Sequence, residues 1–157
     1  MILTEATFSV IYNGEERLLV VEPAALRVLL EHRQQNLHQN ESGGVLIGER
    51  RGKAFIIQRA TPPSKKDQAG RFRFVRNGSS HQQLVDEAYR KTDGTSNYIG
   101  EWHTHPQTIA APSYTDYTNW SKALRGMGIS VVAVVGNMES WWGLHDAGKF
   151  LQFTRVS

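Results

Sequence analysis

The chain has 157 residues and a formal net charge of +3, which is enough for one domain with a sizeable core and too little for two. Its 39% hydrophobic and 21% charged residues are typical of a globular protein, and the lack of cysteine excludes disulfides, thiolate metal sites and a cysteine nucleophile. No signal-peptide pattern and no apolar run of membrane-spanning length is present, so we expect one cytoplasmic domain over residues 1–157 with no membrane association.

The first elements predicted along the chain are a hairpin and a helix. Residues 8–21 alternate apolar and polar side chains on either side of Asn13-Gly14, the strongest short signal for a β-hairpin. Pro23 is tolerated in a first helical turn, and residues 24–37 carry apolar side chains at helical spacing. The sequence therefore predicts a helix from Pro23 through residue 37.

Short strands and loops are predicted next. Residues 43–50 and 54–61 are two runs rich in β-branched side chains, separated by Arg51-Gly52, and are expected to pair. Residues 62–70 are expected to form a loop. Residues 71–75 alternate apolar and polar again, which is typical of a strand.

The second half of the chain alternates helices and strands. We expect a helix over residues 81–91 that is capped by Ser79 or Ser80, and then a strand over 97–105 that stops at Pro106. A second helix is expected from Ser113 to about Arg125, followed by a strand over 129–136 that is buried on both faces. Two antiparallel strands, 140–147 and 149–156, are expected around Gly148. Helices interspersed with hairpins indicate an α/β domain with a mixed sheet.

The stretch from Gly100 to Asp116, "GEWHTHPQTIAAPSYTD", carries the candidate site. His103 and His105 are two apart on a predicted strand, so both imidazoles project from one face. Ser113 and Asp116 are three apart at a predicted helix start and share a face of its first turn. Two imidazoles and one carboxylate are the ligand set of a catalytic zinc, with a fourth position left for water.

The same residues have structural interpretations. Ser113-x-x-Asp116 is also a helix-capping pattern, and histidines on a strand can simply be packed and hydrogen-bonded. A metal-activated water would need a base, for which Glu41, just before a Gly-Gly pair, is one candidate. Glu101 lies on the same face of the strand as the two histidines, and geometry alone leaves both carboxylates open.

These residues follow one another in a fixed pattern: Glu41 precedes "SGGVLIG", and His103-x-His105 is followed by seven residues beginning with Pro106 and then by Ser113-x-x-Asp116. This pattern resembles the JAMM motif of the MPN-plus, or JAB-type, metalloprotease family. The resemblance implies an MPN fold, a curved mixed sheet flanked by helices. It implies that His103, His105 and Asp116 bind one Zn²⁺ per chain, that Glu41 is the general base and acid, and that Ser113 supports the tetrahedral intermediate. Glu101 then has a structural or supporting role.

The resemblance extends beyond the motif to the stretches "YIGEWHTHP", "FRFVRN" and "NESGGVLIGE". These stretches are similar to stand-alone bacterial JAB peptidases, above all to deconjugating peptidases of CBASS anti-phage operons and of bacterial ubiquitin-like conjugation operons. The resemblance implies a protein substrate with an extended C-terminal tail, either a nucleotidyltransferase or a ubiquitin-like protein. The enzyme would cut the bond after the C-terminus of that conjugated protein. The oligomeric state is left open.

Three other functions are compatible with parts of the sequence. A JAB peptidase could trim a sulfur-carrier protein, and an MPN domain could be a non-catalytic binding module, although all five motif positions are filled here. Nucleic-acid binding would use the one concentration of basic residues, Lys65, Lys66, Arg71, Arg73 and Arg76, but no nucleic-acid motif accompanies it, so we expect no such partner. We expect instead that Arg71, Arg73 and Arg76 contact the substrate protein, on a strand edge that accepts its tail.

Overall fold

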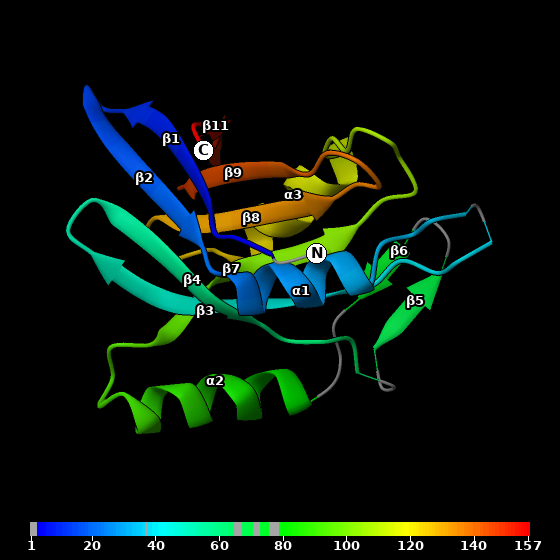
Figure 1. Cartoon of the computed structure of the whole chain (residues 1–157), viewed down its shortest axis with the longest axis horizontal. Coiled ribbons are helices and arrows are strands. Elements are labelled where there is room, and N and C mark those ends of the chain that lie inside the picture. The colour runs from blue at the N-terminus through cyan, green and yellow to red at the C-terminus, as the bar shows by residue number, and fades with distance from the viewer. Residues whose placement is uncertain (1–2, 37, 65–66, 71–72, 76–78) are drawn as a thin grey trace.

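The protein is built around one curved, mixed β-sheet of nine strands, with a separate two-stranded hairpin beside it (Figure 1). The computed structural model describes residues 3–36, 38–64, 67–70, 73–75 and 79–157. In chain order the elements are β1 (Ala6–Tyr12), β2 (Glu15–Val21), α1 (Pro23–Glu31), β3 (Gly43–Arg51), β4 (Ala54–Ala60), β5 (Gln68–Gly70), β6 (Arg73–Val75), α2 (Ser79–Lys91), β7 (Asn97–Thr104), α3 (Tyr114–Ala123), β8 (Ser130–Val135), β9 (Trp141–Asp146), β10 (Lys149–Gln152) and β11 (Thr154–Arg155).

Helices flank both faces of the nine-stranded sheet, whose strand order is β10-β9-β8-β7-β3-β4-β2-β1-β11. The pairs β2–β4 and β7–β8 are parallel, and the other neighbouring strands are antiparallel. In the view of Figure 1, α1 lies in front of the sheet and α3 behind it. The predicted α/β fold, a curved mixed sheet flanked by helices, is confirmed. Within the described part of the chain, no helix has the length and apolar character to cross a membrane.

The sheet curls until its two ends come close together. β10 pairs with β9 at one end of the strand order and β11 pairs with β1 at the other, yet only Phe153 separates β10 from β11. Phe153 is buried, and its backbone N–H donates to the carbonyl of Trp142 at 2.8 Å. The prediction of one continuous strand over residues 149–156 is therefore wrong, because the chain leaves β10 at Phe153 to reach the opposite end of the sheet.

Each helix packs on its own cluster of buried apolar side chains. α1 covers the largest cluster, which includes side chains from β1, β2, β4, β7, β8 and β9. α3 packs on β8 and β9, and α2 packs on β3. The residues of β8 alternate between the α1 cluster and the α3 cluster, and all six are buried. The prediction that this strand is covered on both faces is confirmed.

Tight turns join the antiparallel strands where the sequence predicts them. Asn13 and Gly14 between β1 and β2 have φ angles of 53° and 75°, and Ala147 and Gly148 between β9 and β10 have φ angles of 48° and 82°. Two successive residues with positive φ are typical of the type I′ turn, whose twist matches that of the flanking strands. Both predicted hairpins are confirmed.

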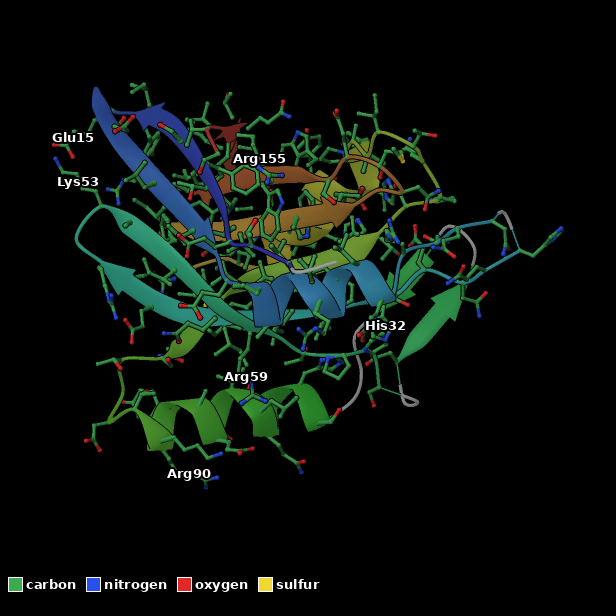
Figure 2. All side chains as sticks on the ribbon, viewed as in Figure 1. Glu15, His32, Lys53, Arg59, Arg90 and Arg155 are labelled. Carbon is green, nitrogen blue, oxygen red and sulfur yellow. The ribbon has the colours of Figure 1, made fainter. Side chains whose placement is uncertain are left out.

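The first helix is shorter than its sequence predicts. α1 ends at Glu31, and the next residue closes it, because the His32 backbone N–H donates to Leu29 O and its ring Nδ1 lies 2.8 Å from Val28 O (Figure 2 labels His32). Beyond His32 the chain forms a loop, in which the side chain of Gln34 is fully buried. The prediction of a helix through residue 37 is wrong, since this tertiary burial overrides the helical spacing.

The expected loop over residues 62–70 contains a strand. Its last three residues form β5, which pairs with β6 in a hairpin with Gly70 opposite Arg73. Buried contacts join this segment and the residue before it to α2: His81 lies 2.6 Å from the hydroxyl of Thr61 and 2.9 Å from the carboxylate of Asp67. The strand predicted over residues 71–75 is confirmed for 73–75, while Arg71 lies outside the described residues.

Gly44 marks a close approach between β3 and the residue that follows β4. A Cβ atom on Gly44 would lie 2.4 Å from the carbonyl oxygen of Thr61 and 2.9 Å from Nε1 of Trp102. Those two atoms are already joined, because Trp102 Nε1–H donates to Thr61 O at 3.2 Å. There is thus no room for a methyl group.

We predict that Gly44→Ala lowers the free energy of unfolding by about 2–3 kcal/mol, because the added carbon forces backbone and indole apart. The measurement is denaturant unfolding. Gly52→Ala is the matched control: Gly52 has a φ of 57° but open space around its Cβ position, so only the left-handed strain of about 1 kcal/mol is expected. Equal losses in both variants would contradict the close approach.

Candidate metal centre

The end of β7 presents the two histidines on one face of the sheet. His103 lies opposite Gly43 of β3 on one side and Val134 of β8 on the other, and the backbone N–H of His105 donates to Val135 O at 3.0 Å. The side chain between them, Thr104, is buried on the opposite face. The alternation predicted from the sequence is confirmed, and the strand that carries it is fixed between two others.

The first turn of α3 brings Asp116 to the histidines. Ser113 caps the helix: its hydroxyl accepts the backbone N–H of Asp116 at 3.1 Å, and Asp116 Oδ2 accepts the backbone N–H of Ser113 at 2.7 Å. This reciprocal arrangement fixes the carboxylate and contributes about 1 kcal/mol to the helix. The capping interpretation of Ser-x-x-Asp is confirmed, and the cap orients the same carboxylate toward the imidazoles.

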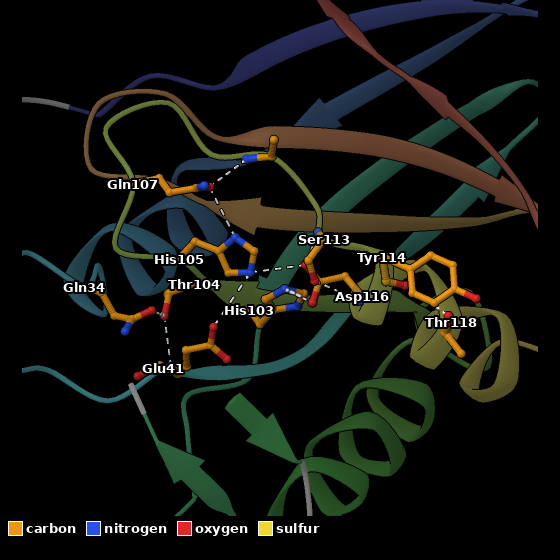
Figure 3. A network of polar contacts seen from close by, with 12 residues as sticks. Gln34, Glu41, His103, Thr104, His105, Gln107, Ser113, Tyr114, Asp116 and Thr118 are labelled. Atoms are coloured by element: carbon orange, nitrogen blue, oxygen red, sulfur yellow. Dashed lines mark hydrogen bonds and ion pairs between the residues drawn. The ribbon is translucent and has the colours of Figure 1, made fainter. Parts of the chain in front are cut away.

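Three donor groups converge in front of the strand end (Figure 3). His103 Nε2 lies 3.0 Å from Asp116 Oδ1, and His105 Nε2 lies 3.2 Å from Asp116 Oδ2. One donor atom from each residue can be chosen so that all lie within 4.8 Å of one another, and no other such cluster of three occurs among the described residues.

The donor set fits a metal ion better than it fits an internal hydrogen-bond cluster. His103 Nε2 is buried and, despite its 3.0 Å distance from Asp116, makes no hydrogen bond of acceptable geometry. This buried nitrogen therefore has no hydrogen-bond partner among the described residues and is available to bind a metal ion. Two imidazoles and a carboxylate are ligands that Zn²⁺ accepts readily, and a three-residue set leaves a position for water.

Gln107 contacts His105 at Nδ1, the ring nitrogen opposite the one that faces Asp116. Its Oε1 accepts the backbone N–H of Ala111 at 3.1 Å and lies 3.3 Å from Nδ1 of His105. Because an amide oxygen can only accept, Nδ1 of His105 carries a proton and Nε2 is the nitrogen that faces Asp116. Partners of this kind fix the ring orientation of metal-binding histidines. The sequence prediction missed Gln107, for which adjacency to His105-Pro106 was the available signal.

The loop before β3 brings Glu41 to the same place. Its side chain is buried, and Oε1 lies 3.7 Å from Nε2 of His105. Burial raises the pKa of Glu41 to about 7; the charge of His105 opposes this rise and that of Asp116 adds to it. A carboxyl group with such a pKa can both accept and release a proton near neutral pH.

The protonation of the cluster is set by mutual contacts. Burial raises the pKa of Asp116, but the close contacts with the His103 and His105 rings outweigh burial and hold that pKa far below its usual range. Burial lowers the pKa of His105, but the contacts with Asp116 and the charge of Glu41 outweigh burial, so the net shift is upward. Asp116 is therefore ionised at neutral pH and supplies the negative charge that attracts a cation.

A cavity of about 230 Å³ opens beside these groups, lined by Glu41, His105, Pro106, Gln107 and Ser113. Ser113 is exposed at its rim. Its hydroxyl oxygen accepts from Asp116 N–H, so the hydroxyl proton can be donated to a bound molecule. A larger hollow of about 510 Å³ lies at the other end of β3, but Arg50 in its lining donates to backbone carbonyls of Tyr98 and Ile129.

Glu101, the other candidate for the base, and Arg73, one of the predicted substrate contacts, lie on β7 and β6. Glu101 shares the face of His103, as expected, but its carboxylate accepts the hydroxyl of Tyr98 at 2.8 Å. Of the arginines expected to contact a substrate, Arg73 is the first residue of β6, and Arg71 and Arg76 lie outside the described residues. The structure thus brings Glu41 to the histidines and engages Glu101 elsewhere.

Known proteins resemble the chain in sequence and in fold. Residues 22–143 match the family model described as prokaryotic homologs of the JAB domain. Two relatives are named CD-NTase/cGAS isopeptidase. The one from Vibrio cholerae serotype O1 is 34% identical over 139 residues, which covers 88% of this chain and 89% of that protein. The one from Escherichia coli strain TW11681 is 33% identical over 129 residues, which covers 82% of this chain and 82% of that protein. The solution structure of protein DSY2949 from Desulfitobacterium hafniense shares the fold, with a TM-score of 0.58 and 22% identity over 84% of this chain and 87% of that chain.

We predict that the protein binds about one zinc ion per chain and that Asp116→Asn loses it, because a neutral amide is a poor zinc ligand. The asparagine side-chain oxygen can still accept Ser113 N–H, so this variant separates metal loss from loss of the helix cap. The measurement is elemental analysis after dialysis. His38→Ala, at an exposed histidine, should keep its zinc; full occupancy in Asp116→Asn would refute the ligand assignment.

Proposed function

Because the chain belongs to the family of prokaryotic JAB-domain homologs, we propose that it is a zinc-dependent isopeptidase. The proposed substrate is a nucleotidyltransferase joined through its C-terminus to another molecule, since the relatives are named CD-NTase/cGAS isopeptidase. Hydrolysis after that C-terminus would reverse the conjugation in bacterial anti-phage defence. The observation that carries the proposal is Glu41, which faces the same small cavity as the two histidines and Asp116.

The proposed chemistry divides the work among five side chains. His103, His105 and Asp116 would hold a zinc ion, which supplies a Lewis acid that lowers the pKa of a water to about 7. Glu41 takes the proton of the attacking water and returns it to the leaving amine, a double role for which a pKa of about 7 is suited. No covalent intermediate with the protein is required, in keeping with a chain that has no cysteine.

Ser113 is proposed to stabilise the oxyanion that forms when water adds to the carbonyl. Its hydroxyl oxygen is occupied by the N–H of Asp116, which leaves the hydroxyl proton as a donor at the rim of the cavity. A donor already fixed before the charge develops needs no reorganisation during the reaction. The helix cap and the oxyanion contact therefore use different parts of one hydroxyl group.

We predict that Glu41→Gln keeps its zinc and its fold but lowers kcat by about 10²–10⁴-fold, because only proton transfer is removed. The measurement is chelator-sensitive release of the nucleotidyltransferase from a purified conjugate. Glu101→Gln is the matched control and should retain activity. An active Glu41→Gln beside an inactive Glu101→Gln would show that the base is misassigned.

The β5–β6 hairpin is the proposed contact for the substrate tail. Figure 1 places it beside the end of β7 that carries the histidines, and within the described residues its two strands pair only with each other. A free strand edge can accept an extended chain through main-chain hydrogen bonds. Arg71, Arg73 and Arg76 would then select a tail or a partner surface with acidic groups.

We predict that Arg73→Glu raises KM for the conjugate about tenfold with little change in kcat, since it weakens substrate binding and not the chemical step. Arg90→Glu is the control: the same charge change at an exposed position on α2 (Figure 2) should have no effect. A short peptide spanning the scissile bond should be a poorer substrate than the folded conjugate, because remote contacts supply much of the orientation. Unchanged KM with the conjugate would remove the hairpin from the substrate contact.

A further inference from the structure

The loop that carries Glu41 is held from inside by two glutamine side chains. Gln34, fully buried, donates from Nε2 to the carbonyl of Gln39 at 2.8 Å. Gln39 returns the contact: its Nε2 donates to Arg33 O at 2.9 Å, and its Oε1 accepts the backbone N–H of Gln35 at 3.0 Å. These reciprocal bonds replace the helical hydrogen bonds that end with α1.

A second set of bonds joins this loop to the histidine strand (Figure 3). Thr104 donates its hydroxyl to Gln34 Oε1 at 3.0 Å and accepts the backbone N–H of Ser42 at 2.9 Å. The backbone of Thr104 also donates to Ser42 O at 2.9 Å. Thus the residue between the two candidate ligands holds the residue next to Glu41 at both its N–H and its carbonyl.

The chemistry of the groups fixes the direction of these bonds. The carbonyl of Gln39 can only accept, so the amide nitrogen of Gln34 must face it, and Oε1 is left to accept from Thr104. Thr104 has one hydroxyl proton, which it gives to Gln34, so its oxygen is available to Ser42 N–H. Gln34 therefore sets the orientation of the hydroxyl that holds Ser42, and each bond in such a chain strengthens the next.

We propose that Gln34 and Thr104 are positioning residues that fix Glu41 against the metal-binding histidines. The proposal rests on the proposed function of Glu41 as base. The β3–β7 register ends at Gly43 opposite His103, two residues after Glu41, so regular strand pairing does not reach the carboxylate. The Gln34–Thr104–Ser42 chain extends the attachment across this gap, and a misplacement of about 1 Å in a reacting group can cost a hundredfold in rate.

The first test needs neither metal nor substrate. In the metal-free protein, amide hydrogen exchange followed by NMR should show exchange at Ser42 about tenfold faster in Gln34→Met than in wild type, because Thr104 loses its fixed orientation. The Thr104 hydroxyl bonds both Gln34 and Ser42, so this result would support transmission through Thr104. Unchanged exchange at Ser42 in Gln34→Met would overturn the proposal, whether or not the protein proves to be a peptidase.

The second test is kinetic. In the zinc-loaded protein, Thr104→Val and Gln34→Met should each lower kcat for the conjugate by about tenfold to a hundredfold, with zinc content and KM unchanged, and Thr104→Ser should restore the rate because it keeps the hydroxyl. Loss of zinc together with rate would mean that Thr104 supports the ligands and not Glu41, and would overturn the proposal, as would an unchanged kcat.

Thr92→Val is the matched control for both measurements. The hydroxyl of Thr92, at the end of α2, also accepts a backbone N–H, that of Ser96 at 2.9 Å, and donates to a carbonyl, that of Ala88 at 2.8 Å. Its removal should lower the melting temperature with Ser42 exchange and kcat unchanged. If Thr92→Val reduced kcat as much as Thr104→Val, the effect would be general loosening of the fold, and the positioning role would be refuted.

Discussion

Strands β3 and β7 pair in antiparallel register up to Gly43 opposite His103, and the candidate site is assembled where that pairing ends. β8 pairs with β7 on its other side, so the strand end that presents the histidines has a neighbour on each side. The loop after His105 is tied down in turn, because Asn137 N–H donates to Gln107 O at 2.8 Å. This loop leads into α3, whose capped first turn delivers Asp116. A change in the β3–β7 register would therefore displace Glu41, which lies just before β3, relative to the three donor groups.

The pKa values of two carboxylates in this site, the buried Glu41 and the half-buried Asp116, are shifted in opposite directions. Burial raises the pKa of both, but Asp116 receives two imidazoles at 3.0 and 3.2 Å and a backbone N–H, whereas Glu41 has one imidazole at 3.7 Å. Asp116 is consequently held ionised, and Glu41 has a pKa of about 7. Such a separation of two neighbouring carboxylates suits one to bind a cation and the other to transfer a proton.

Features set by a few neighbouring residues could be predicted from the sequence. The Asn13-Gly14 turn, the shared face of His103 and His105, and the Ser113 cap depend on local geometry alone. The end of α1 could not be predicted, because it depends on a buried contact between Gln34 and Thr104, far apart in the chain. The break at Phe153 and strand β5 likewise depend on pairing partners that no local pattern reveals. Glu41 could be chosen over Glu101 only through the family resemblance, since their difference lies in tertiary contacts.

The pairing of β1 with β11 joins residues from nearly opposite ends of the sequence, with Phe8 opposite Arg155. Contacts of such high sequence separation form late, because most of the chain must be ordered before they close. Until β11 pairs with it, β1 is an open sheet edge, and its unpaired N–H and C=O groups could form hydrogen bonds with a strand of another chain. The two-residue β11, which carries the charged side chain of Arg155, covers this edge by pairing with β1. Without β11, the edge of β1 would be open to pairing with a strand of another molecule, on the far side of the sheet order from the candidate site.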